Sequence, residues 1–145
     1  MDESPIQILE VRAGEGAQPT TVTAAVTADA SREICTALSE ELDRRRQEPT
    51  GSAEDVLALR DHATLVERFE PLAAADAHAV VSFSESELRN LLLELARYTD
   101  RVDGDHFQPP DLRARLQLIA QVILCLWEAN GLAAAANEAL AHSPH

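Results

Sequence analysis

The chain has 145 residues, of which 46% are hydrophobic and 3% aromatic, and its formal net charge is −13. This composition excludes a disordered chain, and we expect residues 1–145 to fold as a single domain with its own core. The acidity argues against nucleic acid or an anionic membrane as the main partner, because both bind clusters of cations. Every basic residue is arginine, which excludes Schiff-base chemistry on lysine and a phosphate loop with its lysine.

The first 28 residues favour β-structure. Residues 5–12 alternate in part between apolar and polar, "GEGAQP" breaks the chain, and residues 20–28 place Val22, Ala24 and Val26 on one face. This pattern predicts an N-terminal β-hairpin over 1–28, with a flexible arm as the alternative. An isolated hairpin is barely stable, so we expect it to pack on the helices or to pair through its open edge with another copy.

The segment that follows predicts a first helix. Asp29 and Ser31 are both good N-caps, and the helix is expected to begin at one of them. The three arginines of 44–46 suit a helix C-terminus and are interpreted as a solvated helix end. The neighbouring carboxylates Glu40 and Glu41 are interpreted in the same way, as part of an ordinary solvated face.

A second helix is predicted from Ser52, which is a good N-cap and is followed at the capping-box position by Asp55. Pro71 is expected to interrupt or kink this helix, because proline lacks the amide that the helix ladder needs. Residues 72–81 fit either a short helix or an irregular join, and the sequence does not decide between them.

The sequence "FSESEL" gives the clearest local signal. Ser84 is the expected N-cap, Glu87 stands three residues later, and Phe83 and Leu88 occupy the two positions of a hydrophobic staple. A capping box and a staple together predict that a third helix begins at this point.

A last long helix is predicted from Pro109–Pro110. Its apolar residues cover more than one face, so over 110–128 it is either the central helix or part of an interface. One predicted face consists of Leu112, Leu116, Ile119, Ala120, Ile123 and Trp127. Asn130–Gly131 is expected to end this helix, with a short closing helix after it.

Residues 97–111, "RYTDRVDGDHFQPPD", join the last two long helices and are rich in aspartate. Neither register of a calcium-binding loop places oxygen ligands and glycine where that loop requires them, so we interpret the segment as a turn. If polar groups do converge on a ligand here, the candidates are Tyr98, Asp103, Asp105 and His106.

No catalytic residue, metal site or cofactor is predicted. His62, His78 and His106 lack the spacing of helical metal ligands. Cys35 and Cys125 lie within apolar helical patterns, and we expect them to be buried thiols. No glycine-flanked nucleophile motif occurs in the sequence.

The sequence therefore predicts a mainly α fold, a four- to five-helix bundle over 29–145 with an N-terminal β-hairpin. The predicted function is a non-catalytic protein-interaction module whose partner is itself, as a homodimer, or another protein. The alternative is a small enzyme or ligand-binding helical domain with its site near the 97–111 turn. The acidic opening "MDESPIQILE" and the short apolar run near 116–127 favour a cytoplasmic protein without a membrane span.

Overall fold

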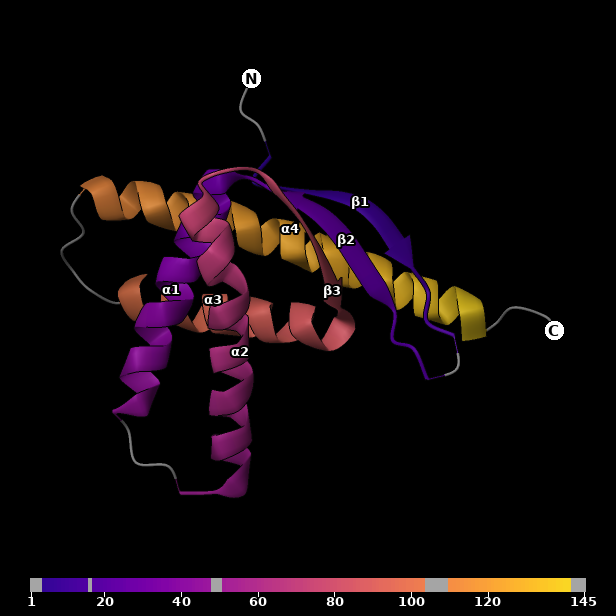
Figure 1. Cartoon of the computed structure of the whole chain (residues 1–145), viewed down its shortest axis with the longest axis horizontal. Coiled ribbons are helices and arrows are strands. Elements are labelled where there is room, and N and C mark those ends of the chain that lie inside the picture. Colours follow the sequence, from indigo (N-terminus) through magenta and orange to yellow (C-terminus); the bar gives the residue numbers. More distant parts are fainter. Residues whose placement is uncertain (1–3, 16, 48–50, 104–109, 142–145) are drawn as a thin grey trace.

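The computed structural model describes residues 4–15, 17–47, 51–103 and 110–141 (Figure 1). These residues are mostly helical, as predicted, and the predicted N-terminal hairpin is present. The elements in chain order are β1 (Ile6–Arg12), β2 (Thr21–Val26), α1 (Ala28–Arg46), α2 (Ala53–Ala75), β3 (Ala79–Ser84), α3 (Glu85–Asp103) and α4 (Pro110–Ala141).

The sheet has three antiparallel strands in the order β1–β2–β3, and its third strand was not predicted. Helix α2 continues through Pro71 to Ala75, so the expected interruption is wrong. Pro71 lies on the exposed side of α2, where water can solvate the carbonyl that proline leaves unpaired. Asp76 then ends the helix in a left-handed conformation, with φ of 50°, and β3 begins three residues later.

The two outer strands, β1 and β3, differ in the features found along them. The register of β1 against β2 shifts between Ile8 and Glu10, which places a bulge at this point of the outer strand. On the other side of the sheet, the Arg68 guanidinium of α2 donates to the carbonyl oxygen of Ser82 in β3. The same guanidinium lies 5.0 Å from the centre of the Phe83 ring.

The N-termini of α1 and α2 show which of the predicted N-caps are correct. Ser52 caps α2 as predicted, with its Oγ accepting from the Asp55 amide at 3.2 Å. Helix α1 begins earlier than predicted, because the hydroxyl of Thr27 accepts from the amide of Ala30 at 3.2 Å. Asp29 instead lies in the first turn of α1, where its negative charge suits the helix dipole.

The capping box of α3 is confirmed in both directions. The Ser84 hydroxyl accepts from the Glu87 amide at 3.2 Å, and the Glu87 carboxylate accepts from the Ser84 amide at 3.0 Å. The two staple residues, Phe83 and Leu88, are both buried in the core.

Helix α4 does not end at Asn130–Gly131 as predicted, but continues to Ala141. Ala129 and Ala133, on either side of the glycine, are buried in the core. The side chain of Asn137 further along donates to Glu85 of α3 and accepts from Thr20. These contacts offset the roughly 1 kcal/mol that a glycine costs in a helix interior.

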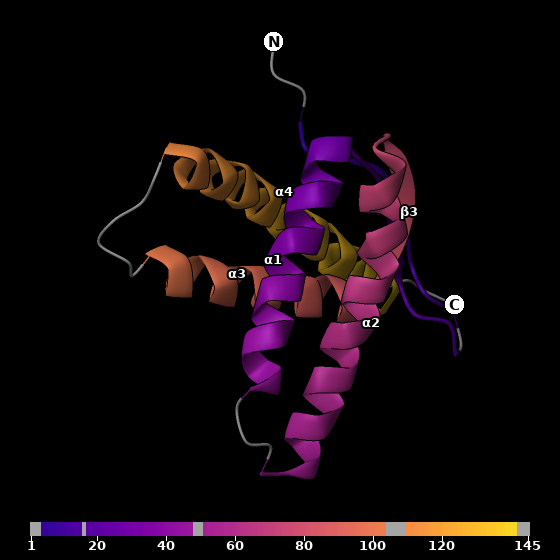
Figure 2. The same cartoon turned by 60° about the vertical axis from the view of Figure 1, so that its left-hand side comes forward.

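Figures 1 and 2 show α1 and α2 side by side as a helical hairpin that extends away from the sheet. The long helix α4 runs past the strands and packs mainly on α3 and β1. Helix α1 crosses both α3 and α4 and contacts each of them. All seven elements contribute to one cluster of buried apolar residues. Within it, the rings of Phe69 and Phe83 stack with their centres 6.2 Å apart and so join α2 to β3.

Candidate functional site

The structure describes the 97–111 turn only in part. Tyr98 lies on α3 and is buried in the core, where desolvation, together with the nearby Glu40 carboxylate, raises the pKa of its phenol to about 12. Asp103 is the last residue of α3, but its side chain lies outside the described residues, as do Asp105 and His106. A ligand site formed by these four residues therefore stays a prediction.

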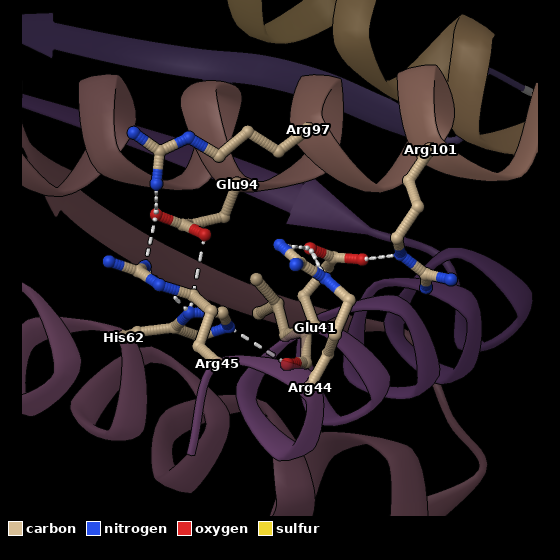
Figure 3. A network of polar contacts seen from close by, with 8 residues as sticks. Glu41, Arg44, Arg45, His62, Glu94, Arg97 and Arg101 are labelled. Carbon is tan, nitrogen blue, oxygen red and sulfur yellow. Dashed lines mark hydrogen bonds and ion pairs between the residues drawn. The ribbon is translucent and has the colours of Figure 1, made fainter. Parts of the chain in front are cut away.

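A buried polar cluster joins α1, α2 and α3 around His62 (Figure 3). Nε2 of His62 lies 2.8 Å from the carbonyl oxygen of Leu38, and its Nδ1 lies 3.2 Å from both Arg45 and the Glu94 carboxylate. Arg45 also donates to Glu94 at 2.9 Å. Desolvation by burial lowers the pKa of His62, although the adjacent Glu94 carboxylate opposes this effect.

The second half of the cluster surrounds Glu41, whose side chain is fully enclosed (Figure 3). Arg44 donates to this carboxylate at 3.1 Å from the same helix, and Arg101 donates to it from α3. Burial alone would raise the pKa of Glu41, but the two arginines stabilise its charged form more and lower that pKa below its ordinary value. Glu41 is thus not part of a solvated face, and that interpretation was wrong for this residue, whereas Glu40 is exposed as expected.

The arginines near the end of α1 are also more than a solvated helix end. Arg44 and Arg45 are both half-buried and bind acids on their own helix and on α3, while Arg46 alone is exposed. The i, i+3 spacing of Glu41 to Arg44 and of Glu94 to Arg97 was the available sequence signal. This spacing shows that two residues share a helix face, but it does not show that the face is buried.

The cluster is suited to holding helices together rather than to chemistry. Its acids are neutralised by arginines, and its members include no hydroxyl or thiol nucleophile. A small cavity of about 110 Å³ lies beside it and is lined in part by His62, Asn90 and Glu94. In the cluster, Glu94 of α3 binds Arg45 of α1, and Glu41 of α1 binds Arg101 of α3, so the cluster fixes the orientation of α1 relative to α3.

Two further features of the described residues bear on ligand binding. Within the described residues, no three or more His, Cys, Asp or Glu side chains are grouped so that they could hold a metal ion. A wider, open hollow of about 550 Å³ lies between the β1–β2 connection and the start of α3, lined in part by Thr20, Arg89 and Asn137. Asn137 is already engaged there by Thr20 and Glu85, so the hollow is bridged rather than formed around a ligand.

Helix α4 presents apolar side chains to solvent. Leu124 and Trp127 are 68% and 59% exposed, whereas Val122 and Leu126 on the opposite side are buried. The predicted apolar face is correct in part: Ile119 is buried and Leu112, Leu116 and Ile123 pack against the core, whereas Ala120 and Trp127 are exposed. Eight exposed residues lie in line on this side of the helix, and we call them the outward face of α4: Arg113, Gln117, Ala120, Leu124, Trp127, Gly131, Ala134 and Glu138.

Because α4 is unbroken, its apolar stretch is longer than the sequence indicated. Within the described residues, Asp111–Ala139 is long and apolar enough to cross a membrane by length and composition alone. This is weak support for a membrane span, since a helix in the core of a folded protein passes the same test. Only 28% of the most apolar window is buried, so α4 has one covered side and one open side and is not enclosed as a central helix.

Comparison of the chain with protein-family models, with curated proteins and with solved structures gave no match.

Proposed function

We propose that the chain is a non-catalytic protein-interaction module that self-associates through the outward face of α4. One observation carries the proposal: Leu124 and Trp127 lie one helical turn apart on α4 and are both more than half exposed. Large apolar side chains grouped on one helix face lower the free energy of association when a partner covers them. Trp is also among the residues most enriched at the centres of protein interfaces.

The rest of the molecule supports this face as a rigid platform. The buried face of α4 contributes Ile119, Val122 and Leu126 to the core shared with the other three helices, and we propose that the helices act as one bundle-like support. The buried acid–arginine cluster further fixes α1 against α3. A preorganised surface loses little conformational entropy on binding, which favours association.

The proposal also includes the class of partner and the location of the protein in the cell. The net charge of −13 disfavours nucleic acid and anionic lipid as partners, because both repel an acidic surface at moderate ionic strength. We propose a cytoplasmic protein whose partner is a second copy of itself.

Light scattering on a size-exclusion column tests the proposal directly. We expect a mass above the 15.8 kDa of one chain that rises with concentration, and we expect Leu124→Glu to restore the single-chain mass. The matched control is Leu57→Glu, which places the same charge at a 55% exposed leucine on α2 and should leave association unchanged. A mass of 15.8 kDa at every concentration would refute the proposed function.

A further inference from the structure

We propose that α4 pairs with α4 of a second copy in an antiparallel orientation, around a twofold axis midway between Leu124 and Trp127. This inference rests on the proposed function, and it names the partner and the geometry of the same face. Three independent features of the outward face of α4 support it: the spacing of its residues, their order by size and their charge.

The spacing along the outward face of α4 is that of a coiled-coil seam. Successive members of the set, from Arg113 to Glu138, are separated alternately by four and three residues. That spacing keeps a set of side chains on one line facing a neighbouring helix. All eight residues are exposed, so the seam has no partner within the described part of the chain. It exists only because α4 continues through Gly131.

The seam is also close to a palindrome in size. Two large residues, Leu124 and Trp127, are flanked by the small residues Ala120 and Gly131 at equal distances from the midpoint. An antiparallel twofold brings Leu124 of each copy onto Trp127 of the other, and Ala120 onto Gly131. Each contact then occurs twice, as a self-complementary interface requires. The small residues leave room beside the axis for two indole rings.

The charges at the ends of the seam select the antiparallel arrangement. In a parallel pair each residue faces its own copy, so Arg113 would meet Arg113 and Glu138 would meet Glu138. In the antiparallel pair Arg113 of each copy meets Glu138 of the other, because the two lie equally far from the midpoint. Opposite charges attract across an interface and like charges penalise the wrong register.

The two Arg113–Glu138 pairs also limit the angle at which the two α4 helices cross. Arg113 and Glu138 each lie about 19 Å along the axis from the midpoint at 1.5 Å per residue. Helices that cross at about 50° would separate too far at that distance, whereas a crossing of about 20° keeps both ends within reach of a long side chain. The seam is about 38 Å long and roughly 10 Å wide. Its footprint falls short of the roughly 800 Å² per partner of a standard interface, so we expect a weak, concentration-dependent dimer.

A lipid bilayer is the competing occupant of an apolar helix face. The seam disfavours it, because Arg113, Gln117 and Glu138 lie in line with the apolar pair and would have to leave water with it. A second copy instead supplies each of those residues with a polar or small neighbour.

Disulfide trapping with single-cysteine variants tests the geometry. Ala120→Cys and Gly131→Cys are made separately in a chain that carries Cys35→Ala and Cys125→Ala, and they are oxidised alone and as a mixture. We expect a cross-linked dimer only in the mixture, because an antiparallel pair brings position 120 onto position 131. Cross-linking of Ala120→Cys with itself would mean a parallel pair and would overturn the inference, while concentration-dependent association would still support the proposed function.

Charge reversal gives a second test that does not depend on cysteine. Arg113→Glu and Glu138→Arg should each weaken the dimer about tenfold, because each changes two symmetric pairs from attraction to repulsion. The double variant should restore wild-type association. Loss of fold cannot explain such a result, since each single change places the charge that its end of the helix favours. Failure of the double variant to recover would overturn the antiparallel pairing.

The membrane alternative is tested by flotation of the wild-type chain with phosphatidylcholine vesicles, with and without phosphatidylserine. We expect the chain to remain in the lipid-free fraction. Flotation that Leu124→Glu abolishes, together with a mass of 15.8 kDa in solution, would identify the face as a lipid-binding surface and would overturn both proposals.

Discussion

The imidazole Nε2 of His62 lies 2.8 Å from the carbonyl oxygen of Leu38, deep between α1 and α2. A carbonyl oxygen can only accept, so this nitrogen carries the proton and the neutral ring has its lone pair on Nδ1. Arg45 lies 3.2 Å from that Nδ1 and can donate to it. The Glu94 carboxylate lies equally close to Nδ1 and favours the protonated ring, but burial disfavours the charge more strongly, so the pKa of His62 is lowered and the neutral ring is favoured.

The lowered pKa of His62 predicts that part of the free energy of unfolding depends on pH. Its folded pKa lies below the unfolded value of about 6.5, so the unfolded state takes up the proton first as pH falls. The stabilisation is complete above about pH 6.5 and declines as the pH falls toward the folded pKa. His62→Gln keeps a donor for Leu38 and should flatten the dependence of unfolding free energy on pH in this window. A slope that is the same in His62→Gln as in the wild type would contradict this assignment.

Glu41 should contribute a second pH dependence at lower pH. Its pKa is lowered because hydrogen bonds from Arg101 and Arg44 outweigh the burial that would raise it, so its stabilisation is present above about pH 4.5 and lost as pH falls through the folded pKa. Glu41→Gln should cost about 2 kcal/mol at pH 7. Its difference from the wild type should shrink below pH 4.5 in denaturant titrations. An equal loss in Asp43→Asn, an exposed change on the same helix, would contradict this assignment.

Ser84→Ala should destabilise the protein by roughly 1 kcal/mol, the usual cost of losing an N-cap. The change removes the acceptor for the Glu87 amide at the start of α3, while the reciprocal bond to the Glu87 carboxylate remains. Urea unfolding measures the loss, and Ser86→Ala in the exposed first turn is a suitable control. No measurable change would show that this cap contributes nothing to stability.

Gly131→Ala should stabilise the protein by up to about 1 kcal/mol, because alanine is the better helix former. A Cβ added at this position meets no atom within 4 Å in a single chain. The measurement is chemical unfolding at a low protein concentration, where association does not contribute. Destabilisation would instead indicate a left-handed glycine that ends the helix, as the Asn130–Gly131 pair suggested on sequence alone.

Trp127 should report association directly, since it is the one tryptophan of the chain and is 59% exposed. Covering the indole removes water from it, so the emission maximum should move to shorter wavelength as protein concentration rises. The Leu124→Glu variant should keep the emission of an exposed indole at every concentration. A dimer mass without any spectral change would place the interface elsewhere on the molecule.

Sequence reasoning succeeded where the deciding contacts are local. The caps at Ser52 and Ser84 each depend on residues within four positions, and both are confirmed. The buried cluster was missed because its partners are far apart in the chain: Glu41 and Arg101 are separated by 60 residues, and Arg45 and Glu94 by 49. Amphipathic spacing places these side chains on a helix face, but only the tertiary fold decides that the face is covered.

Two other errors have the same physical cause. Strand β3 follows an alanine-rich segment that favours helix, and it is strand because its Val81 and Phe83 pair with β2 across the sheet. Helix α4 passes through Gly131 because Ala129 and Ala133 are buried on either side of it. In both places tertiary packing outweighs a local preference of about 1 kcal/mol or less per residue.

The two edges of the sheet bear on whether further chains can add to this protein strand by strand. An exposed strand edge is a template on which further chains can add, strand by strand, into fibres. On β3, the guanidinium of Arg68 binds the carbonyl oxygen of Ser82 and so takes up one acceptor of this outer strand, and on β1 the bulge between Ile8 and Glu10 breaks the regular ladder. Both outer strands thus carry a feature that makes the addition of a further strand less favourable, so we expect a concentrated solution of the chain to form no fibrils.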